Sequence, residues 1–323
     1  MTSITVIIPT YRRPQDLARC LEALKHQTRP VNQVIVTVRD IDAETWQFLA
    51  SYNREITLPL QTVTVTVAGV VAAMNQGLSV ASGDIIAFTD DDAAPHPDWL
   101  ERMEAHFQAN AKIGAVGGRD WQYIGTRIKE EGEREDVGRL QWFGRVIGNH
   151  HFGVGKAREV DVLKGVNMGF RRSAIQGMRF DERMLGTGAQ VHFELAFNLA
   201  LRRRGWKIIF DPLVAVDHYP AVRFDEDKRD QFNSVAWSNA VHNETLVLLE
   251  HFSLLQRTIF IFWAFLIGTR EALGLVQLLR LLPSESNLTV QKWIASMDGR
   301  IKGWQSWLNY RNVTTPKEVA TTK

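Results

Sequence analysis

The sequence predicts an α/β fold organised around a mainly parallel sheet, and two observations support this prediction. Over the first 120 residues, short β-branched runs alternate with segments of helical length, and polar or glycine-containing turns separate them. The chain has 323 residues and is 45% apolar, which is enough for a substantial buried core. Ligands of parallel sheets bind beyond the carboxyl ends of the strands, so we expect the functional residues in the loops that follow them.

Strand and helix candidates alternate along the first part of the chain. The expected strands are Ile4–Ile8, Val34–Val38, Thr62–Val67, Ile85–Thr89 and Ile113–Gly117. The first expected helix begins near Pro14. Three further helices are expected at about Ala43–Asn53, Gly69–Ser82 and Pro97–Asn110. In the first helix, apolar residues recur at helical spacing, which predicts one face packed on the sheet. These residues are Leu17, Cys20, Leu21 and Leu24.

Residues 122–164 break this alternation. A charged stretch is followed there by aromatic residues and glycines, which is typical of a mobile insertion that covers a site. A helix over Val191–Arg204 and strands at Lys207–Phe210 and Val214–Val216 then return the chain to the folded body. We expect that body to end near Asp230.

Residues 231–323 predict a helical, partly hydrophobic extension. Its centre, Ile259–Gly268, is an uninterrupted apolar run of ten residues between Arg257 and Arg270. As a helix such a run rises only ~15 Å, about half of a bilayer core, so a clean membrane span fails on length. Attachment to a membrane surface, ordinary packing on the body, and a distorted or re-entrant span stay open. Tryptophans among basic residues farther on suit either a headgroup-level anchor or a plain amphipathic helix. They are Trp293, Trp304 and Trp307.

Composition excludes several classes of function. Lys and Arg total 38 against 36 Asp and Glu, so the net charge of +2 gives no electrostatic reason to expect nucleic acid as a partner. The single cysteine, Cys20, excludes an intramolecular disulfide framework and a cysteine-based zinc site. The first residues resemble a strand rather than a signal peptide, so we expect a cytoplasmic protein.

The most specific local signal is the acidic loop Asp90–Asp92, which directly follows an apolar strand. Adjacent carboxylates repel one another unless a cation lies between them, and a hard divalent ion such as Mn²⁺ or Mg²⁺ answers that repulsion. Such an ion leaves coordination positions for phosphate oxygens, so the loop predicts a nucleoside diphosphate ligand. The alternative is an acidic cap for the next helix.

The loops after the first two strands carry further candidates. Residues Pro9–Pro14 place a hydroxyl, an aromatic ring and two guanidiniums at the same edge as the acidic loop, a set that can stack a base and neutralise phosphate. After the second strand, Asp40 and Asp42 can accept hydrogen bonds from a base or ribose, or cap the following helix.

Three motifs in the second half add polar groups. Gly165 and Asn167 suit a sugar pocket, because glycine permits close backbone approach and the amide can hydrogen-bond. His192 and Glu194 stand at the start of a helix, where a carboxylate is either functional or a complement to the helix dipole. His218 closes a strand, and it either completes the coordination of a metal or serves as a structural hydrogen-bonding residue.

The order of these motifs resembles the family 2 glycosyltransferases, inverting enzymes with the GT-A fold, over about residues 4–220. The resemblance rests on Val6–Arg13, Ala73–Gly77, Ala81–Phe88, Asp90–Asp92 and Pro97–Leu100. It implies a GT-A catalytic domain over residues 1–230, with a nucleotide-binding half at 1–120 and an acceptor-binding half at 121–230. The extension at 231–323 would then be the membrane-associating part.

The resemblance also implies roles for single residues. The predicted nucleotide-binding set is Pro9, Thr10, Tyr11, Arg13, Asp40, Asp42, Asn75, Asp90 and Asp91. The predicted metal ligands are Asp90, Asp92 and His218. Glu194 corresponds to the carboxylate that deprotonates the acceptor, with His192 as a second candidate, and Gly165 and Asn167 would border the sugar or acceptor. The sequence departs from the family pattern at Arg39, at Met74 and at Phe193–Glu194.

These observations and the resemblance together predict a metal-dependent glycosyltransferase that moves a sugar from a nucleotide sugar to a glycan or lipid-linked acceptor, and the resemblance implies that it inverts the configuration of the sugar. We expect it to act in cell-surface polysaccharide synthesis, peripherally at the cytoplasmic face of a membrane. One alternative is a sugar-nucleotide pyrophosphorylase, but that class requires a glycine-rich phosphate loop where this chain has Pro9–Arg12. Another is a catalytically silent, membrane-associated binding protein that keeps the fold.

Overall fold

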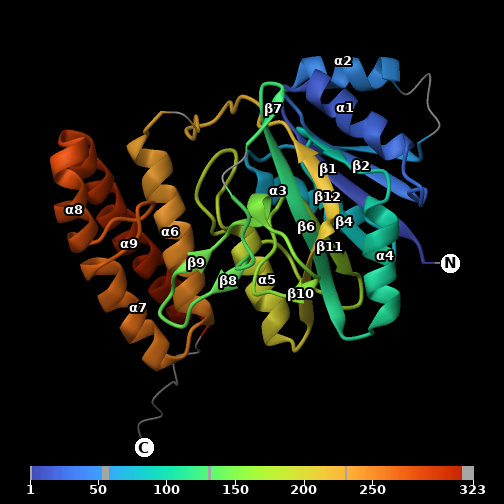
Figure 1. The fold of residues 1–323 in the computed structure, drawn as a ribbon. Coiled ribbons are helices and arrows are strands. Elements are labelled where there is room, and N and C mark those ends of the chain that lie inside the picture. The colour runs from blue at the N-terminus through green and yellow to red at the C-terminus, as the bar shows by residue number, and fades with distance from the viewer. Residues whose placement is uncertain (1, 53–57, 130–131, 230, 315–323) are drawn as a thin grey trace, which may run out of the picture.

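The computed structural model describes residues 2–52, 58–129, 132–229 and 231–314, and it shows a mixed sheet flanked by helices with a helical bundle beside it (Figure 1). The first half of the sheet is parallel, in the order β3-β2-β1-β4. These strands are β1 (Ile4–Thr10), β2 (Gln33–Arg39), β3 (Leu60–Val65) and β4 (Ile85–Thr89). Their carboxyl ends therefore meet at one edge, as the sequence predicts.

The second half of the sheet contains antiparallel pairs. β11 (Asn167–Arg171) runs antiparallel to both β4 and β6 (Ile113–Ile124), and β12 (Lys207–His218) lies parallel to β6. The prediction of two separate strands at 207–210 and 214–216 is wrong. They form one strand, because β12 continues through an irregular register between Asp211 and Val216. Short strands β5 (Ala93–Pro95), β7 (Arg127–Ile128) and β10 (Arg158–Glu159) complete this half.

Helices cover both faces of the sheet. α1 (Pro14–Lys25), α2 (Ala43–Tyr52) and α4 (Trp99–Ala109) share one core with alternate side chains of β1. α3 (Val70–Val80) and α5 (Phe193–Arg203) share a second core with the opposite side chains. α3 lies close to the sheet because Gly77 has no side chain, and a Cβ there would lie 2.6 Å from Ile7. The small-residue helix predicted at 69–82 therefore has a packing reason.

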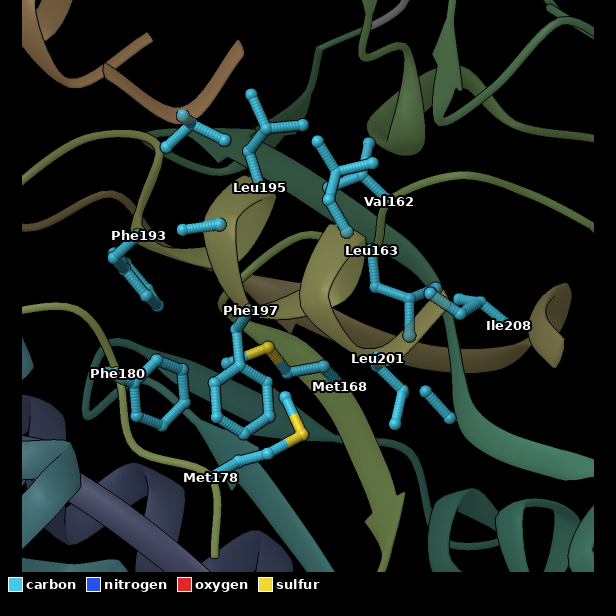
Figure 2. Close-up of a cluster of buried hydrophobic side chains, with 14 of the residues drawn as sticks. Val162, Leu163, Met168, Met178, Phe180, Phe193, Leu195, Phe197, Leu201 and Ile208 are labelled. Atoms are coloured by element: carbon cyan, nitrogen blue, oxygen red, sulfur yellow. The ribbon is translucent and has the colours of Figure 1, made fainter. Parts of the chain in front are cut away.

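The second core fixes the position of α5, which carries two candidate catalytic residues in or before its first turn. Figure 2 shows Phe193, Leu195, Phe197 and Leu201 extending from this helix among apolar side chains of the sheet and loops. The ring of Phe197 stacks on that of Phe180, with centroids 4.2 Å apart. Because this face of α5 is densely packed, the backbone that presents Glu194 is held rigidly against the sheet.

The predicted mobile insertion at 122–164 has defined contacts in the described residues. It contains the hairpin of β8 (Arg139–Leu140) and β9 (Val146–Ile147) and a short 3₁₀ helix, η1 (His150–Phe152). The hairpin tip packs on the C-terminal bundle, where the rings of Phe143 and Trp263 lie 5.2 Å apart. The hairpin therefore contacts both the sheet domain and the extension, and the predicted mobility of 122–164 stays a prediction.

The extension consists of α6 (Ser234–His251), α7 (Leu254–Leu266), α8 (Leu275–Glu285) and α9 (Asn287–Thr314), and residues 230 and 315–323 lie outside the described part. Gly299 and Gly303 let α9 approach α6 closely, since a Cβ at either position would lie under 3 Å from the α6 backbone. In the described part of the chain, no helix has the length and apolar character needed to cross a bilayer.

The apolar run in the extension is partly packed and partly exposed. Phe260 and Ala264 of α7 are buried, whereas Phe262 and Leu266 face outward. Of the two alternatives for the tryptophans, packing within a helical bundle applies to Trp307, which is buried with the Arg257 guanidinium over its ring. Packing on the body therefore explains one face of α7, and the other face is left apolar and open.

Candidate active site

The carboxyl ends of β1, β2 and β4 border a cavity of about 320 Å³. Its walls come from the loop after β1, the acidic loop after β4, the start of α3, and two later segments at 187–189 and 222–229. Six predicted nucleotide-binding residues line it, namely Pro9, Thr10, Tyr11, Arg13, Asp90 and Asp91. The structure thus brings together the loops of strands that are separated by up to 80 residues in the sequence.

The three predicted metal ligands also meet. One oxygen each from Asp90 and Asp92 and one ring nitrogen of His218 all lie within 4.8 Å of one another. Asp92 Oδ1 and His218 Nε2 are 3.4 Å apart, and both are buried without a hydrogen-bond partner among the described residues. A buried carboxylate oxygen and a buried imidazole nitrogen that converge in this way fit a divalent cation, because each can serve as its ligand when the ring is neutral.

The second oxygen of Asp92 holds the surrounding loops. Asp92 Oδ2 accepts a hydrogen bond from the Ala221 backbone N–H at 2.9 Å and pairs with Arg13 at 3.3 Å and Arg229 at 3.6 Å. Burial raises the pKa of Asp92, yet His218, Arg13 and the Ala221 N–H together hold it well below its ordinary value. Asp92 is therefore ionised and ready to face a cation.

Asp90 and Asp91 experience the repulsion that the sequence predicts. Burial and the neighbouring Asp92 carboxylate raise the pKa of Asp90. Burial likewise raises the pKa of Asp91 to about 7, although Arg13 Nε lies 3.2 Å from its Oδ2. Three carboxylates packed this closely are stable as anions only with positive charge among them, and Arg13 supplies part of it.

His218 lies between two carboxylates. Its Nε2 faces Asp92, and its Nδ1 lies 3.3 Å from Oδ2 of the buried Asp120. Burial lowers the pKa of His218, but its contacts with Asp120 and Asp92 outweigh this and raise it to about 9. Lys164 Nζ donates to the same Asp120 oxygen at 2.5 Å. Sequence analysis has no local signal for Asp120, because its partners are remote in the chain, whereas Lys164 begins the motif of Gly165 and Asn167 that is expected to line a sugar pocket.

Asp40 and Asp42, predicted to bind the base, are not among the described residues that line the cavity, whereas Arg39 is. Asp42 is buried and accepts hydrogen bonds from the backbone N–H groups of Arg12 at 2.6 Å and Thr45 at 3.2 Å. Asp42 thus caps α2 and ties it to the loop after β1. This geometry favours the capping alternative for Asp42.

Asn75, Gly165 and Asn167 also have structural tasks. The Asn75 amide exchanges hydrogen bonds with the backbone of Phe180. Asn167 accepts from Trp99 Nε1 and donates to two backbone carbonyls, so its amide is used within the protein. A Cβ at Gly165 would lie 2.6 Å from the Phe193 ring. These contacts give all three residues a structural role within the protein, and their predicted contacts with a nucleotide, sugar or acceptor stay predictions.

Glu194 and His192 flank the start of α5, beside the cavity wall at Phe193. Burial raises the pKa of Glu194, and His192 and Lys164 act in the opposite direction. Asp90 also raises the pKa of Glu194, as the last of the contributing groups. Neither Glu194 nor His192 is among the described residues that line the cavity, although their neighbour Phe193 is. A carboxylate with a raised pKa beside the cavity suits proton abstraction near neutral pH.

A segment that sequence analysis did not select, 222–229, closes one side of the cavity. The Phe224 ring meets the Tyr11 ring edge-on at 6.1 Å, and Asp225 accepts from the Ala189 N–H at 2.8 Å. Glu226 accepts from the Thr187 N–H at 2.9 Å. The available signal was the dense run of charged residues directly after the His218 motif.

The fold is an α/β domain of the GT-A type, with an acidic cavity at the carboxyl ends of its parallel strands. The family model described as glycosyl transferase family 2 matches residues 5–179, more than half of the chain. The chain therefore belongs to glycosyl transferase family 2. This confirms the resemblance drawn from the motifs.

The curated relatives match a limited part of the chain. Glycosyltransferase AglE of Haloferax volcanii is 36% identical over 122 residues, which cover 36% of this chain and 38% of AglE. The uncharacterized glycosyltransferase YibD of Escherichia coli is 30% identical over 100 residues, which cover 31% of this chain and 29% of YibD. This chain thus aligns with about a third of the length of these relatives.

Solved structures match the fold over almost the whole chain. S. aureus TarS 1-349 in complex with UDP-GlcNAc gives a TM-score of 0.59 at 14% identity, covering 93% of this chain and 81% of TarS. Mannosyltransferase PcManGT from Pyrobaculum calidifontis, in complex with GDP-Man and Mn²⁺, gives a TM-score of 0.59 at 16% identity, covering 95% and 87%. At these identities the likeness shows the fold alone.

Proposed function

We propose that this chain transfers a sugar from a nucleoside diphosphate sugar to the hydroxyl of an acceptor. The observation that carries the proposal is the convergence of Asp90, Asp92 and His218 at a cavity lined by Tyr11 and Arg13. An aromatic ring suits a base, a guanidinium suits phosphate, and the convergent ligands suit a divalent cation. The nucleotide sugars bound by TarS and PcManGT support the same substrate class.

In this proposal Asp90, Asp92 and His218 hold Mn²⁺ or Mg²⁺. When bound, the ion supplies charge that stabilises the departing diphosphate. Arg13 lies next to the same carboxylates and adds a fixed positive charge on the cavity side. Residues 1–120 then serve the nucleotide and residues 121–230 the acceptor.

Glu194 is the proposed general base, with His192 as the second candidate. The Glu194 carboxylate takes the proton of the acceptor hydroxyl, and the oxygen attacks the anomeric carbon of the sugar. The bond from that carbon to the diphosphate breaks, and the nucleoside diphosphate leaves with the electron pair. A single displacement of this kind inverts the configuration at the anomeric carbon. The raised pKa of Glu194 supports its part in the reaction.

We further propose a lipid-linked or glycan acceptor at the cytoplasmic face of a membrane, in cell-surface polysaccharide synthesis. Exposed apolar side chains on α7 and α8 support a membrane surface as partner, and exposed Arg270 and Arg280 suit anionic headgroups. The apolar set includes Leu254, Leu255, Phe262, Leu266, Leu275, Val276, Leu279 and Leu282. A 25% identical relative named glucosyl-dolichyl phosphate glucuronosyltransferase supports a lipid-linked acceptor.

The donor site is tested by calorimetry with UDP, GDP and dTDP, with and without Mn²⁺, on the wild type and on Asp92→Ala. We expect one nucleotide to bind in a metal-dependent way and to lose affinity in the variant. If the folded wild type binds none of them, the donor assignment fails, and a catalytically silent binding protein becomes the better description. Loss of donor hydrolysis in Glu194→Gln, with nucleotide binding kept, supports the enzyme.

The membrane proposal needs its own experiment. Flotation with vesicles of phosphatidylglycerol and phosphatidylcholine should recover the wild type and lose Phe262→Glu. Leu213→Glu is the matched control, because Leu213 is 59% exposed on β12, outside the extension. Equal recovery of all three proteins, or no recovery of the wild type, would count against a membrane partner.

A further inference from the structure

We propose that Asp120, supported by Lys164, is a positioning residue that fixes the ring of His218 so that Nε2 faces the cation. This inference rests on the proposed function, because it needs the cation site of Asp90, Asp92 and His218. Asp120 is not among the described residues that line the cavity, and its described contacts do not include Asp90 or Asp92. Its proposed effect is exerted through His218.

The geometry around Asp120 carries the inference. Its side chain is 0% exposed, and its Oδ2 gathers Lys164 Nζ at 2.5 Å, Gln122 Nε2 at 3.2 Å and His218 Nδ1 at 3.3 Å. A buried carboxylate costs several kcal/mol of desolvation unless cations and donors surround it, on the order estimated for buried ions. Lys164 therefore compensates the charge of Asp120 at the same oxygen that contacts the proposed histidine ligand.

The sheet sets this arrangement. Asp120 lies on β6 and His218 on the parallel neighbour β12, where the register pairs Asp120 with Val216 and Gln122 with His218. Side chains two residues apart on neighbouring strands point to the same face, so Asp120 and His218 meet diagonally. Lys164 comes from the loop before β11 and reaches the same carboxylate. Two rigid strands thus hold the carboxylate and the ring.

The chemistry of imidazole gives this contact its consequence. A neutral ring carries its proton on one nitrogen and binds a cation with the other. In the neutral ring that coordination requires, an ionised Asp120 can only accept, so it stabilises the proton on Nδ1. The Nε2 lone pair is then left for a cation on the side of Asp92 Oδ1, 3.4 Å from Nε2. Asp120 therefore selects both the tautomer and the ring orientation that coordination requires.

The first experiment compares Mn²⁺ affinity of the full chain, measured by the free Mn²⁺ signal in electron paramagnetic resonance. We expect Asp120→Asn to weaken Mn²⁺ binding by about 10–100-fold, the usual effect of losing a carboxylate behind a ligating histidine. Asp211→Asn is the matched control. Asp211 lies on β12, the strand of His218, and its Oδ2 is 2.7 Å from Nε2 of a different histidine, His106. Unchanged Mn²⁺ affinity in a folded Asp120→Asn protein would overturn the inference.

A second measurement needs no substitution at Asp120. Nitrogen-15 spectra of the histidine rings in the wild type, saturated with diamagnetic Mg²⁺, report which nitrogen of His218 carries the proton. We expect the proton on Nδ1, and a proton on Nε2 would refute the proposal even if Asp120→Asn fails to fold. His218→Gln identifies the resonance. If the wild type binds no divalent ion at all, the proposed metal site fails, whereas binding that is indifferent to Asp120 refutes only this inference.

Discussion

Replacement of Asp42 by alanine separates the structural role of this carboxylate from the predicted base-reading role. Asp42 accepts hydrogen bonds from the Arg12 and Thr45 N–H groups, at 2.6 and 3.2 Å. Loss of the cap on α2 costs about 0.5–2 kcal/mol. Loss of the charge-assisted bond to Arg12 costs about 1.5–3 kcal/mol, and the exposure of Arg12 favours the lower end. We expect the free energy of unfolding to fall by about 2–3 kcal/mol in total.

Urea denaturation followed by circular dichroism measures this loss, and equal slopes in wild type and variant validate the comparison. Because the loop after β1 carries Tyr11 and Arg13, nucleotide affinity should also fall, by the same factor for UDP, GDP and dTDP. Asp40→Ala is the control, since Asp40 is 41% exposed and its Oδ1 accepts from the neighbouring Ile41 N–H. A stable Asp42→Ala protein that loses affinity for one nucleotide alone would refute this reasoning and restore the base-binding role.

Three further predictions concern catalysis and packing. Glu194→Gln should lower the transfer rate by about 10²–10⁴-fold with nucleotide affinity unchanged, by product assay and calorimetry. The base acts in its deprotonated form and its pKa is raised. The wild-type rate should therefore fall as the pH decreases, with a midpoint above ~4.3, the ordinary pKa of a glutamate. Gly303→Val places a Cβ 2.8 Å from the His242 carbonyl and should cost about 1–3 kcal/mol in urea, whereas Gly148→Ala, with nothing described within 4 Å, should not. Phe197→Ala, 2% exposed, should cost about 3–5 kcal/mol, and a loss under about 1 kcal/mol would contradict its packing.

The fold could be predicted from sequence wherever a single element satisfies its own pattern. The strand at Ile85–Thr89 has the predicted bounds, and α1 buries the predicted apolar face, because periodicity of two or 3.6 residues is a local property. β12 was divided in prediction because Asp211 and Pro212 interrupt its apolar run. The irregular register at that point keeps the strand continuous, and it depends on the neighbouring β6, which no local pattern records.

The site could be predicted only as far as charge and strand ends allow. The Asp90–Asp92 loop was recognisable because adjacent carboxylates after a buried strand already require compensation. Asn75 is expected to bind nucleotide from the resemblance and Asn167 to bind a sugar from its amide, but a sequence does not show which groups an amide contacts. Both amides hydrogen-bond within the protein. The link between Asp120 and His218 spans 98 residues, so only the packed sheet reveals it.

The two oxygens of Asp92 divide the work of this residue, and the division decides which variant is informative. Oδ2 ties Ala221, Arg13 and Arg229 together and so joins the loops after β1, β4 and β12, whereas Oδ1 faces His218 Nε2. Asp92→Ala removes both functions at once, so loss of nucleotide binding in that variant follows equally from a missing cation and from separated loops. Asp120→Asn leaves the contacts of Asp92 Oδ2 untouched and alters the support of the histidine together with the contacts of Asp120 to Lys164 and Gln122. A fall in Mn²⁺ affinity with the loops of the cavity still joined can therefore be expected from substitution of Asp120, which contacts His218 Nδ1, and not from substitution of Asp92.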